Sequence, residues 1–266
     1  MDVQSHAASL AAHNLTLGYE TKQICQNLSL EIPQGKFTVI VGPNGCGKST
    51  LLKSLCRLLK PTRGTILLNG KDIHQWPTKE VAKKLGLLPQ SANTPNGILV
   101  RDLVARGRYP HQSVFRQWSE DDQKAVHSAM QAANVLALAE QSVDSLSGGQ
   151  RQRVWIAMVL AQQTPTLMLD EPTTYLDIAH QIELLDLFKT LNLKEGRTVV
   201  AVLHDLNQAC RYADHIIALN AGELIAQGRP NEIINEALIE RVFGLKNCIV
   251  PDPVTKTPMV IPLSRW

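Results

Sequence analysis

Hydrophobic and polar side chains alternate along much of the first part of the chain. Residues 10–19 and 24–32 carry apolar side chains at about every second position, a period that is typical of half-buried β-strands. Residues 64–69 are similar and predict a further strand at the edge of a sheet. We therefore expect short strands to dominate this part of the chain.

Other apolar stretches are continuous. They cover residues 37–41, 85–88, 167–169 and 199–203. Strands that are buried on both faces have this composition, because helices cover both sides of a parallel sheet. These runs predict the core of an α/β fold.

Helical spacing occupies the segments between these runs. Leu51, Leu52 and Leu55 recur at helical spacing, and the pattern is helical from about residue 100 to 163 and over 178–193. The last third of the chain predicts two short strands, a small helix over about residues 231–242, and a proline-punctuated tail from Pro251.

Composition narrows the class of protein. The chain has 266 residues, of which 44% are hydrophobic and 19% charged, as in soluble globular proteins of one large or two small domains. A net charge of +3 gives no reason to expect a nucleic-acid partner. The five cysteines are scattered and are expected to be reduced thiols of a cytosolic protein. The longest apolar run, residues 154–161, is far shorter than the roughly twenty residues of a spanning helix, so any membrane role is expected to be peripheral.

A glycine-rich loop lies between the apolar run 37–41 and the helix that follows it. Its sequence fits G-x-x-x-x-G-K-[ST], and strand, loop and helix together form a phosphate cradle. Glycines let successive backbone N–H groups surround phosphate, Lys48 reaches the β- and γ-phosphates, and the Ser49 hydroxyl ligates Mg²⁺. The predicted nucleotide-binding residues here are Gly42, Pro43, Asn44, Gly45, Cys46, Gly47, Lys48, Ser49 and Thr50.

Two acidic residues follow the buried run 167–169. Ligands bind at the carboxyl ends of parallel strands, which is where Asp170 and Glu171 are expected. Asp170 is therefore predicted to hold Mg²⁺ through water, and Glu171 to act as the general base that deprotonates the attacking water.

Ser147 and Gln150 have the spacing of a capping box, which predicts that a helix begins there. Gly148 and Gly149 leave the first N–H groups of that helix unobstructed, so a second anion site is expected.

The sequence Leu-Ser-Gly-Gly-Gln at residues 146–150, between the phosphate loop and the acidic pair, resembles the signature of ABC-type ATPases. The resemblance extends from Leu10 to about Pro262. It implies a phosphate-loop core with a mixed sheet and helices, an N-terminal antiparallel β subdomain, and an inserted helical subdomain over about residues 95–163. The ATPase domain is then expected over residues 10–245, followed by a tail over 246–266.

The resemblance also implies roles for single residues. Tyr19 would stack on adenine, His204 would contact the γ-phosphate, and Gln90 would ligate Mg²⁺ and sense a membrane partner. Asp177 would communicate across a dimer. ATP and Mg²⁺ are the implied cofactors. Ser147, Gly148, Gly149 and Gln150 would complete the nucleotide site of the facing subunit.

Two residues depart from the commonest family pattern: Tyr175 is bulkier than the usual alanine, and Cys46 stands where serine or alanine is frequent.

With one set of motifs per chain, the simplest expected assembly is an isologous two-fold pair of identical subunits. The resemblance implies that nucleotide is sandwiched head-to-tail in this pair, between the phosphate loop of one subunit and the signature of the other. Translation factors of this family fuse two cassettes, chromosome ATPases insert a long coiled coil, and exporters usually carry their own spanning helices. None of these features is found in this sequence. An importer subunit on two separate membrane permeases, at the cytoplasmic face of the bacterial inner membrane, fits best.

The segment 105–111 and the stretches 150–162, 204–213 and 252–262 resemble ATPases of ferric-siderophore and cobalamin importers. This implies iron(III)-siderophore uptake that also involves a periplasmic binding protein, and it leaves cobalamin and haem importers, or a non-transport ATPase, as alternatives. Arg106, Arg108, Tyr109 and His111, with Gln90, are predicted to contact the permease. The alternative for the first four is a solvated helix end.

Overall fold

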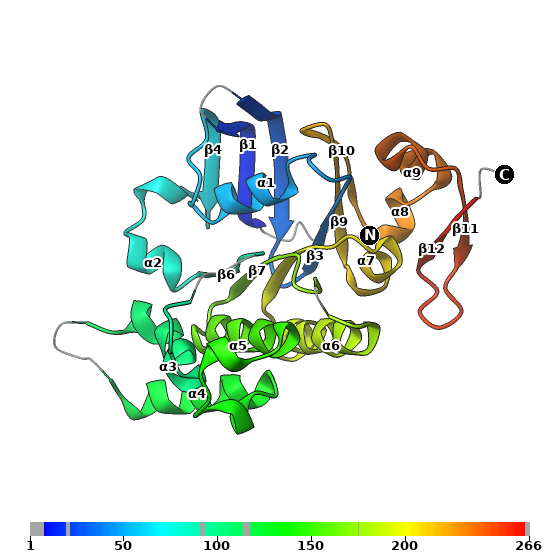
Figure 1. The fold of residues 1–266 in the computed structure, drawn as a ribbon. Coiled ribbons are helices and arrows are strands. Elements are labelled where there is room, and N and C mark those ends of the chain that lie inside the picture. Colours follow the sequence, from blue (N-terminus) through cyan, green and yellow to red (C-terminus); the bar gives the residue numbers. More distant parts are fainter. Residues whose placement is uncertain (1–7, 20–21, 91–93, 114–117, 175, 264–266) are drawn as a thin grey trace. The chain divides into compact units, whose positions relative to one another are not determined.

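The computed structural model describes residues 8–19, 22–90, 94–113, 118–174 and 176–263 (Figure 1). These residues form two compact units. Unit 1 combines Met1–Trp76 with Asn192–Trp266, and unit 2 is Pro77–Leu191. Tyr175 lies outside the described residues.

One sheet of unit 1 is antiparallel and has the strand order β2-β1-β4-β5. Strand β1 (Ala8–Tyr19) pairs with β2 (Lys22–Pro33) on one side and β4 (Arg63–Leu68) on the other, and β5 (Lys71–Asp72) extends the edge. Leu10, Leu15 and Leu17 of β1 are fully buried, as the alternating pattern predicts. The expected N-terminal antiparallel subdomain is confirmed.

The parallel strands of unit 1 surround β3 (Phe37–Val41). Strand β3 pairs in parallel with β8 (Thr198–Val202) and β9 (His215–Asn220), and β10 (Glu223–Gly228) pairs antiparallel with β9. Every residue of β3 and β8 is buried, which explains their continuous apolar sequences. Helix α1 (Lys48–Leu55) follows β3 after the glycine-rich loop.

The C-terminal part of unit 1 differs from the sequence prediction. Two helices replace the single one expected over 231–242, namely α8 (Pro230–Ile233) and α9 (Glu236–Phe243), because Asn235 is extended and caps α9 by accepting from Leu238 N. The expected tail forms an antiparallel hairpin of β11 (Asn247–Pro251) and β12 (Pro258–Pro262). Helix α7 (Leu206–Tyr212) packs against β12 and β3.

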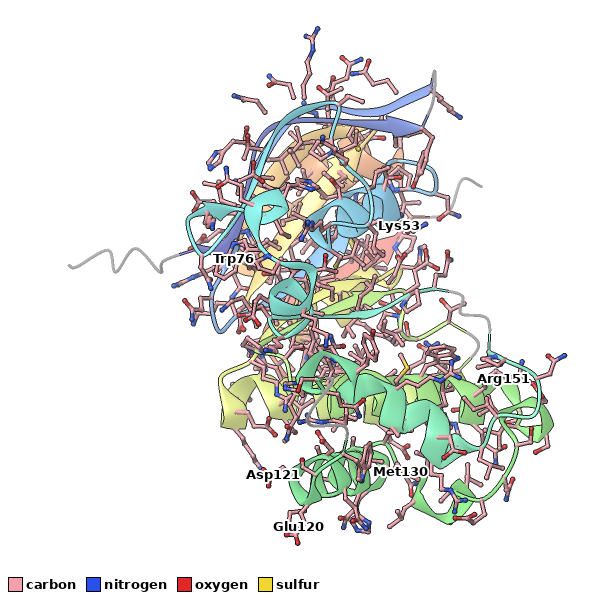
Figure 2. All side chains as sticks on the ribbon, turned by 90° about the vertical axis from the view of Figure 1, so that its left-hand side faces the viewer. Lys53, Trp76, Glu120, Asp121, Met130 and Arg151 are labelled. Carbon is pink, nitrogen blue, oxygen red and sulfur yellow. The ribbon has the colours of Figure 1, made fainter. Side chains whose placement is uncertain are left out.

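Unit 2 contains the parallel pair β6 (Leu85–Leu88) and β7 (Thr166–Asp170). Its helices are α2 (Thr78–Ala82), α3 (Val100–Ala105), α4 (Glu120–Ala132), α5 (Gly148–Ala161) and most of α6 (Ile178–Glu195), with the 3₁₀ helix η2 (Arg106–His111) after α3. Helices α3, α4 and α5 pack on one another. Figure 2 shows Glu120 and Asp121 pointing outward at the start of α4, whereas Met130 near its end is buried. Within the described ranges, every helix is too short or too polar to cross a bilayer.

Candidate nucleotide-binding and hydrolysis site

The phosphate loop is built around glycines with positive φ angles. Gly42, Gly45 and Gly47 have φ values of 154°, 78° and 103°. A Cβ atom on Gly42 would lie 2.2 Å from Leu219 O, and one on Gly47 would lie 2.5 Å from Cys25 Sγ. Other residues would therefore strain or displace the loop, whereas glycine lets its backbone approach a ligand closely.

The loop leads into the N-terminus of α1 and carries the Lys48 ammonium. Lys48 Nζ donates to Gly42 O at 2.8 Å and to Pro43 O at 2.9 Å, and its side chain is buried. The N-cap is Gly47, no side chain caps the helix, and its first turn has no acidic residue. The helix dipole and the ammonium thus both favour an anion at this loop.

His204 lies at the same edge of the sheet as the phosphate loop. Ile40 of β3 is in register with Val202 of β8, and Leu203 N donates to Ile40 O at 3.4 Å. Because the two strands are parallel, their carboxyl ends lead into Gly42 and His204 respectively. The side chain of His204 is exposed, and Asp205 after it caps α7 as predicted, accepting from Asn207 N and Gln208 N. Tyr19 ends β1 with 46% of its surface exposed.

Gln90, Asp170 and Glu171 gather at the carboxyl ends of β6 and β7 in unit 2. Asp170 is the last residue of β7 and is buried. Gln90 Nε2 donates to Glu171 Oε2 at 2.7 Å, so the amide orients this carboxylate. Glu171 has a φ of 52°, a conformation that costs about 1 kcal/mol for a residue other than glycine. Strained backbone of this kind is common at functional sites.

The signature segment forms the predicted capping box. The Ser147 hydroxyl accepts from Gln150 N, and Gln150 Oε1 accepts from Ser147 N at 3.0 Å. Ser147, Gly149 and Gln150 line a groove of about 550 Å³ together with Leu176 and Asp177. Hydrogen bonds from the backbone and ring of His180 lower the pKa of Asp177. The structure thus brings Asp177 and the signature into one groove, which the sequence spacing alone did not show.

The prediction for the segment 106–111 is partly wrong. Arg108 is not a surface contact residue: it is 5% exposed, its Nε donates to Asp122 Oδ1 at 2.7 Å, and its Nη1 donates to Ala161 O at 2.8 Å. His111 Nε2 lies 2.8 Å from Gln162 O. Arg106 and Tyr109 do lie on the surface, and Lys79 places its ammonium 5.3 Å from the centroid of the Tyr109 ring. Lys79, which is distant in sequence, had no local signal that could have identified it.

Comparisons with known proteins show which sequences this chain resembles. The sequence model of the ABC transporter family matches residues 25–174. The ferric enterobactin transport ATP-binding protein of Escherichia coli is 58% identical over 97% of this chain and 95% of its own length. The achromobactin transport ATP-binding protein of Dickeya dadantii is 54% identical over 97% and 96%.

Two solved structures are similar in fold. A metal-chelate type ABC transporter in an inward-facing conformation matches with a TM-score of 0.82 and 29% identity over 97% of this chain and 98% of that one. A dimeric ATP-binding cassette bound to ADP and phosphate matches with a TM-score of 0.74 and 30% identity over 83% and 98%.

Proposed function

The chain belongs to the ABC transporter family as an ATP-binding subunit, and from this premise we propose that its ATP hydrolysis drives import of an iron(III)-siderophore complex. The proposal of ATP hydrolysis is supported above all by the hydrogen bond between Gln90 and Glu171, which lies beside buried Asp170 at the ends of two parallel strands. The proposed cargo is inferred from the two relatives described above, which transport two different siderophores and share more than half of their residues with this chain. Cobalamin and haem are the alternative cargoes.

The phosphate loop is the proposed cradle for the triphosphate. Its backbone N–H groups and the α1 dipole would bind phosphate oxygens, and Lys48 would exchange its carbonyl partners for the β- and γ-phosphates. Tyr19 would stack on adenine. Ser49, Gln90 and Asp170 offer hydroxyl, amide and carboxylate oxygens, the ligand types that Mg²⁺ prefers. When bound, Mg²⁺ neutralises charge on the phosphates.

Glu171 is the proposed general base. Its carboxylate is held by Gln90, so one oxygen is already positioned and the attacking water would donate to this group. His204 would contact the γ-phosphate from the loop after β8. Phosphoryl transfer depends on such positioning more than on covalent chemistry.

The proposed assembly is a head-to-tail dimer. The N-terminus of α5, with Gly148 and Gly149 in its first turn, would bind the γ-phosphate held by the second copy. Asp177, in the same groove, would lie at this dimer interface. The dimeric cassette that resembles this chain supports the arrangement.

Separate permease subunits are the proposed partners in the membrane. Arg106, Tyr109 and Lys79 form an exposed cationic and aromatic patch on unit 2, and such a patch suits the polar cytoplasmic loops of a permease. The chain would then work at the cytoplasmic face of the bacterial inner membrane, with a periplasmic siderophore-binding protein delivering cargo on the other side.

Growth of a deletion strain on single iron sources tests this function. We expect loss of growth on one ferric siderophore, restoration by the intact gene, and no restoration by a Glu171→Gln variant. Growth on ferric chloride in excess is the control. Normal growth on every siderophore, with loss of cobalamin or haem use instead, would reject the proposed cargo while leaving the ATPase assignment intact.

A further inference from the structure

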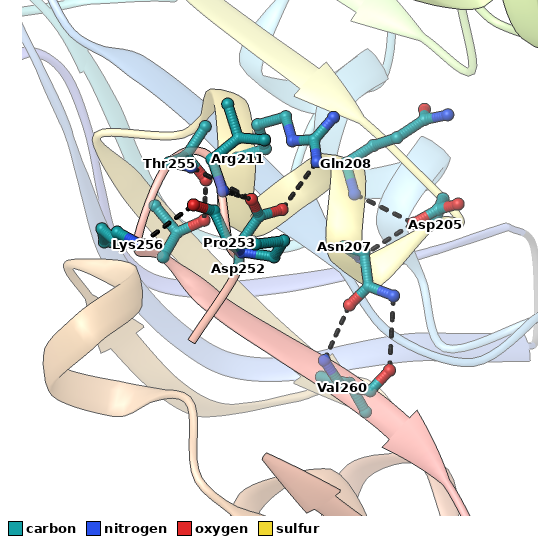
Figure 3. A network of polar contacts seen from close by, with 11 residues as sticks. Asp205, Asn207, Gln208, Arg211, Asp252, Pro253, Thr255, Lys256 and Val260 are labelled. Carbon is teal, nitrogen blue, oxygen red and sulfur yellow. Dashed lines mark hydrogen bonds and ion pairs between the residues drawn. The ribbon is translucent and has the colours of Figure 1, made fainter. Parts of the chain in front are cut away.

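The C-terminal hairpin is fastened to α7, the helix that begins directly after His204 and Asp205. Asp205 Oδ1 accepts from Asn207 N at 2.8 Å and from Gln208 N at 2.9 Å, so the turn that carries His204 is tied to the first turn of α7 (Figure 3). Helices as short as α7 are unstable alone, so its position depends on what it packs against.

Asn207 forms the first attachment. Its amide group binds both backbone groups of Val260 in β12: Val260 N donates to Asn207 Oδ1 at 2.7 Å, and Asn207 Nδ2 donates to Val260 O at 3.3 Å (Figure 3). The side chain thus pairs with β12 as a neighbouring strand would. The residue whose N–H is held by Asp205 is therefore also the residue that holds the hairpin.

Arg211, one helical turn further along α7, forms the second attachment. Its Nη2 lies 2.6 Å from Asp252 Oδ2, and the Asp252 side chain is only 5% exposed. The other oxygen, Oδ1, accepts from Val254 N at 2.8 Å and from Thr255 N at 3.0 Å, which fixes the hairpin turn. Arg211 and these backbone groups hold the pKa of Asp252 well below its usual range.

The hairpin is also held on its far side. Asn247 Nδ2, at the start of β11, donates to Glu236 O of α9 at 3.1 Å and to Leu245 O at 2.9 Å. β11 packs on α9, and α9 packs on β9, which is the parallel neighbour of β3. The hairpin therefore packs, through α9, on the same sheet that carries the phosphate loop. Its position is fixed in this way, and its contacts with α7 can fix the position of that helix in turn.

We propose that Asn207 and Arg211 are positioning residues for ATP hydrolysis: by binding the C-terminal hairpin they fix α7 and, through Asp205, the orientation of His204 toward the phosphate loop. This inference rests on the proposed contact between His204 and the γ-phosphate. The alternative is that the hairpin stabilises unit 1 without influencing the reaction.

The test measures steady-state ATP hydrolysis by the full-length chain carrying Asn207→Ala or Asp252→Asn, each alone and combined with His204→Ala. Asp252→Asn retains an oxygen for Val254 N and Thr255 N but loses the charge opposite Arg211. We expect each single variant to lower kcat by about fivefold to tenfold with KM for ATP changed by less than about twofold, since a transition-state contact is affected. Lys256→Ala is the matched control, because Lys256 lies in the same turn and its ammonium donates to Pro253 O rather than to α7; this variant should retain full turnover.

The combination with His204→Ala separates the two explanations. If the hairpin acts through His204, neither variant lowers kcat further in the His204→Ala background, whereas independent effects would multiply. Multiplied losses, or full turnover in both single variants, would overturn the proposal. Normal turnover in His204→Ala alone would instead refute the role of His204. Unfolding midpoints show whether each variant is folded. If Asn207→Ala does not fold, Asp252→Asn and Arg211→Lys decide the question. Arg211→Lys keeps the positive charge opposite Asp252 and should retain most of the wild-type kcat.

Discussion

At the scale of single residues, the proposed hydrolytic site contains a carboxylate that is held by a hydrogen bond. Glu171 combines a left-handed backbone with a hydrogen bond from Gln90 at 2.7 Å. A left-handed backbone conformation is unfavourable for glutamate and persists only where the surrounding structure fixes it. The strain and the hydrogen bond together support the proposal that Glu171, rather than buried Asp170, accepts the proton.

Glu171→Gln should lower turnover by about 10²–10⁴ while leaving nucleotide affinity within a fewfold, because the amide retains the shape of the side chain but cannot accept the proton of the attacking water. ATP hydrolysis and equilibrium binding of a fluorescent ATP analogue measure the two effects. Glu120→Gln, an exposed glutamate at the start of α4, is the control and should behave as wild type. Normal turnover in Glu171→Gln would refute the assignment.

Cys46 should react slowly with thiol reagents. Its side chain is 3% exposed, and burial raises its pKa against the lowering effect of Lys48, so little reactive thiolate is present at neutral pH. Burial also raises the pKa of Cys25 to about 11. We expect maleimide to label half-buried Cys56 and Cys248 first, Cys46 more slowly and increasingly as pH rises, and ATP to protect Cys46. Mass spectrometry of the labelled chain measures each rate; equal labelling of Cys46 with and without ATP would contradict its place in the nucleotide site.

At the scale of elements, a buried ion pair joins the helices of unit 2. Arg108 in η2 binds Asp122 in α4 and the carbonyl of Ala161 in α5, and both charged side chains are 6% exposed. Burial alone would raise the pKa of Asp122, yet hydrogen bonds from Arg108 and Ser119 outweigh it and lower that pKa. One guanidinium thus connects three elements.

Arg108→Met should destabilise the chain by about 3–5 kcal/mol, because it leaves the Asp122 carboxylate buried without its partner. Arg106→Met, two residues away and exposed, should change stability by less than about 0.5 kcal/mol. Denaturant unfolding compares the two variants. Similar midpoints for both would show that the ion pair contributes little, and the double variant with Asp122→Leu should recover part of the loss.

Sequence patterns predicted the elements whose cause is local, and failed where the cause lies far along the chain. The buried strand β3, the glycine loop and the capping box of Ser147 and Gln150 each follow from adjacent residues. The sequence of the C-terminal hairpin predicts a tail, because prolines stand at the ends of its short strands. The hairpin is held by Asn207 and Arg211, which lie more than forty residues earlier in the chain. Local sequence patterns cannot reveal contacts between residues that are so far apart in the chain. The burial of Arg108 depends in the same way on Asp122 and Ala161.

At the scale of the whole molecule, an importer ATPase must do two separable things, hydrolyse ATP and transmit the resulting motion to a permease. The proposed residues divide accordingly. The phosphate loop, Glu171 and His204 are proposed to serve hydrolysis. Arg106, Tyr109 and Lys79 lie on the exposed surface of unit 2, and no hydrogen bond described for them involves these proposed catalytic groups. Damage to the second set should therefore stop transport without stopping hydrolysis.

Charge reversal at Arg106 and Lys79 tests this separation. Arg106→Glu with Lys79→Glu removes two surface cations and the cation–π contact with Tyr109, so a patch that meets acidic or polar permease loops would be repelled, and this costs complementarity rather than folding. We expect siderophore-dependent growth to fall to the level of the deletion strain while the purified chain retains hydrolysis within about twofold. Lys124→Glu, an exposed cation on α4 of the same unit, controls for the change in net charge and should support normal growth. Unimpaired growth of the double variant would place the permease contact elsewhere on the chain, and loss of hydrolysis in the purified protein would show that the surface of unit 2 and the catalytic groups cannot be separated in this way.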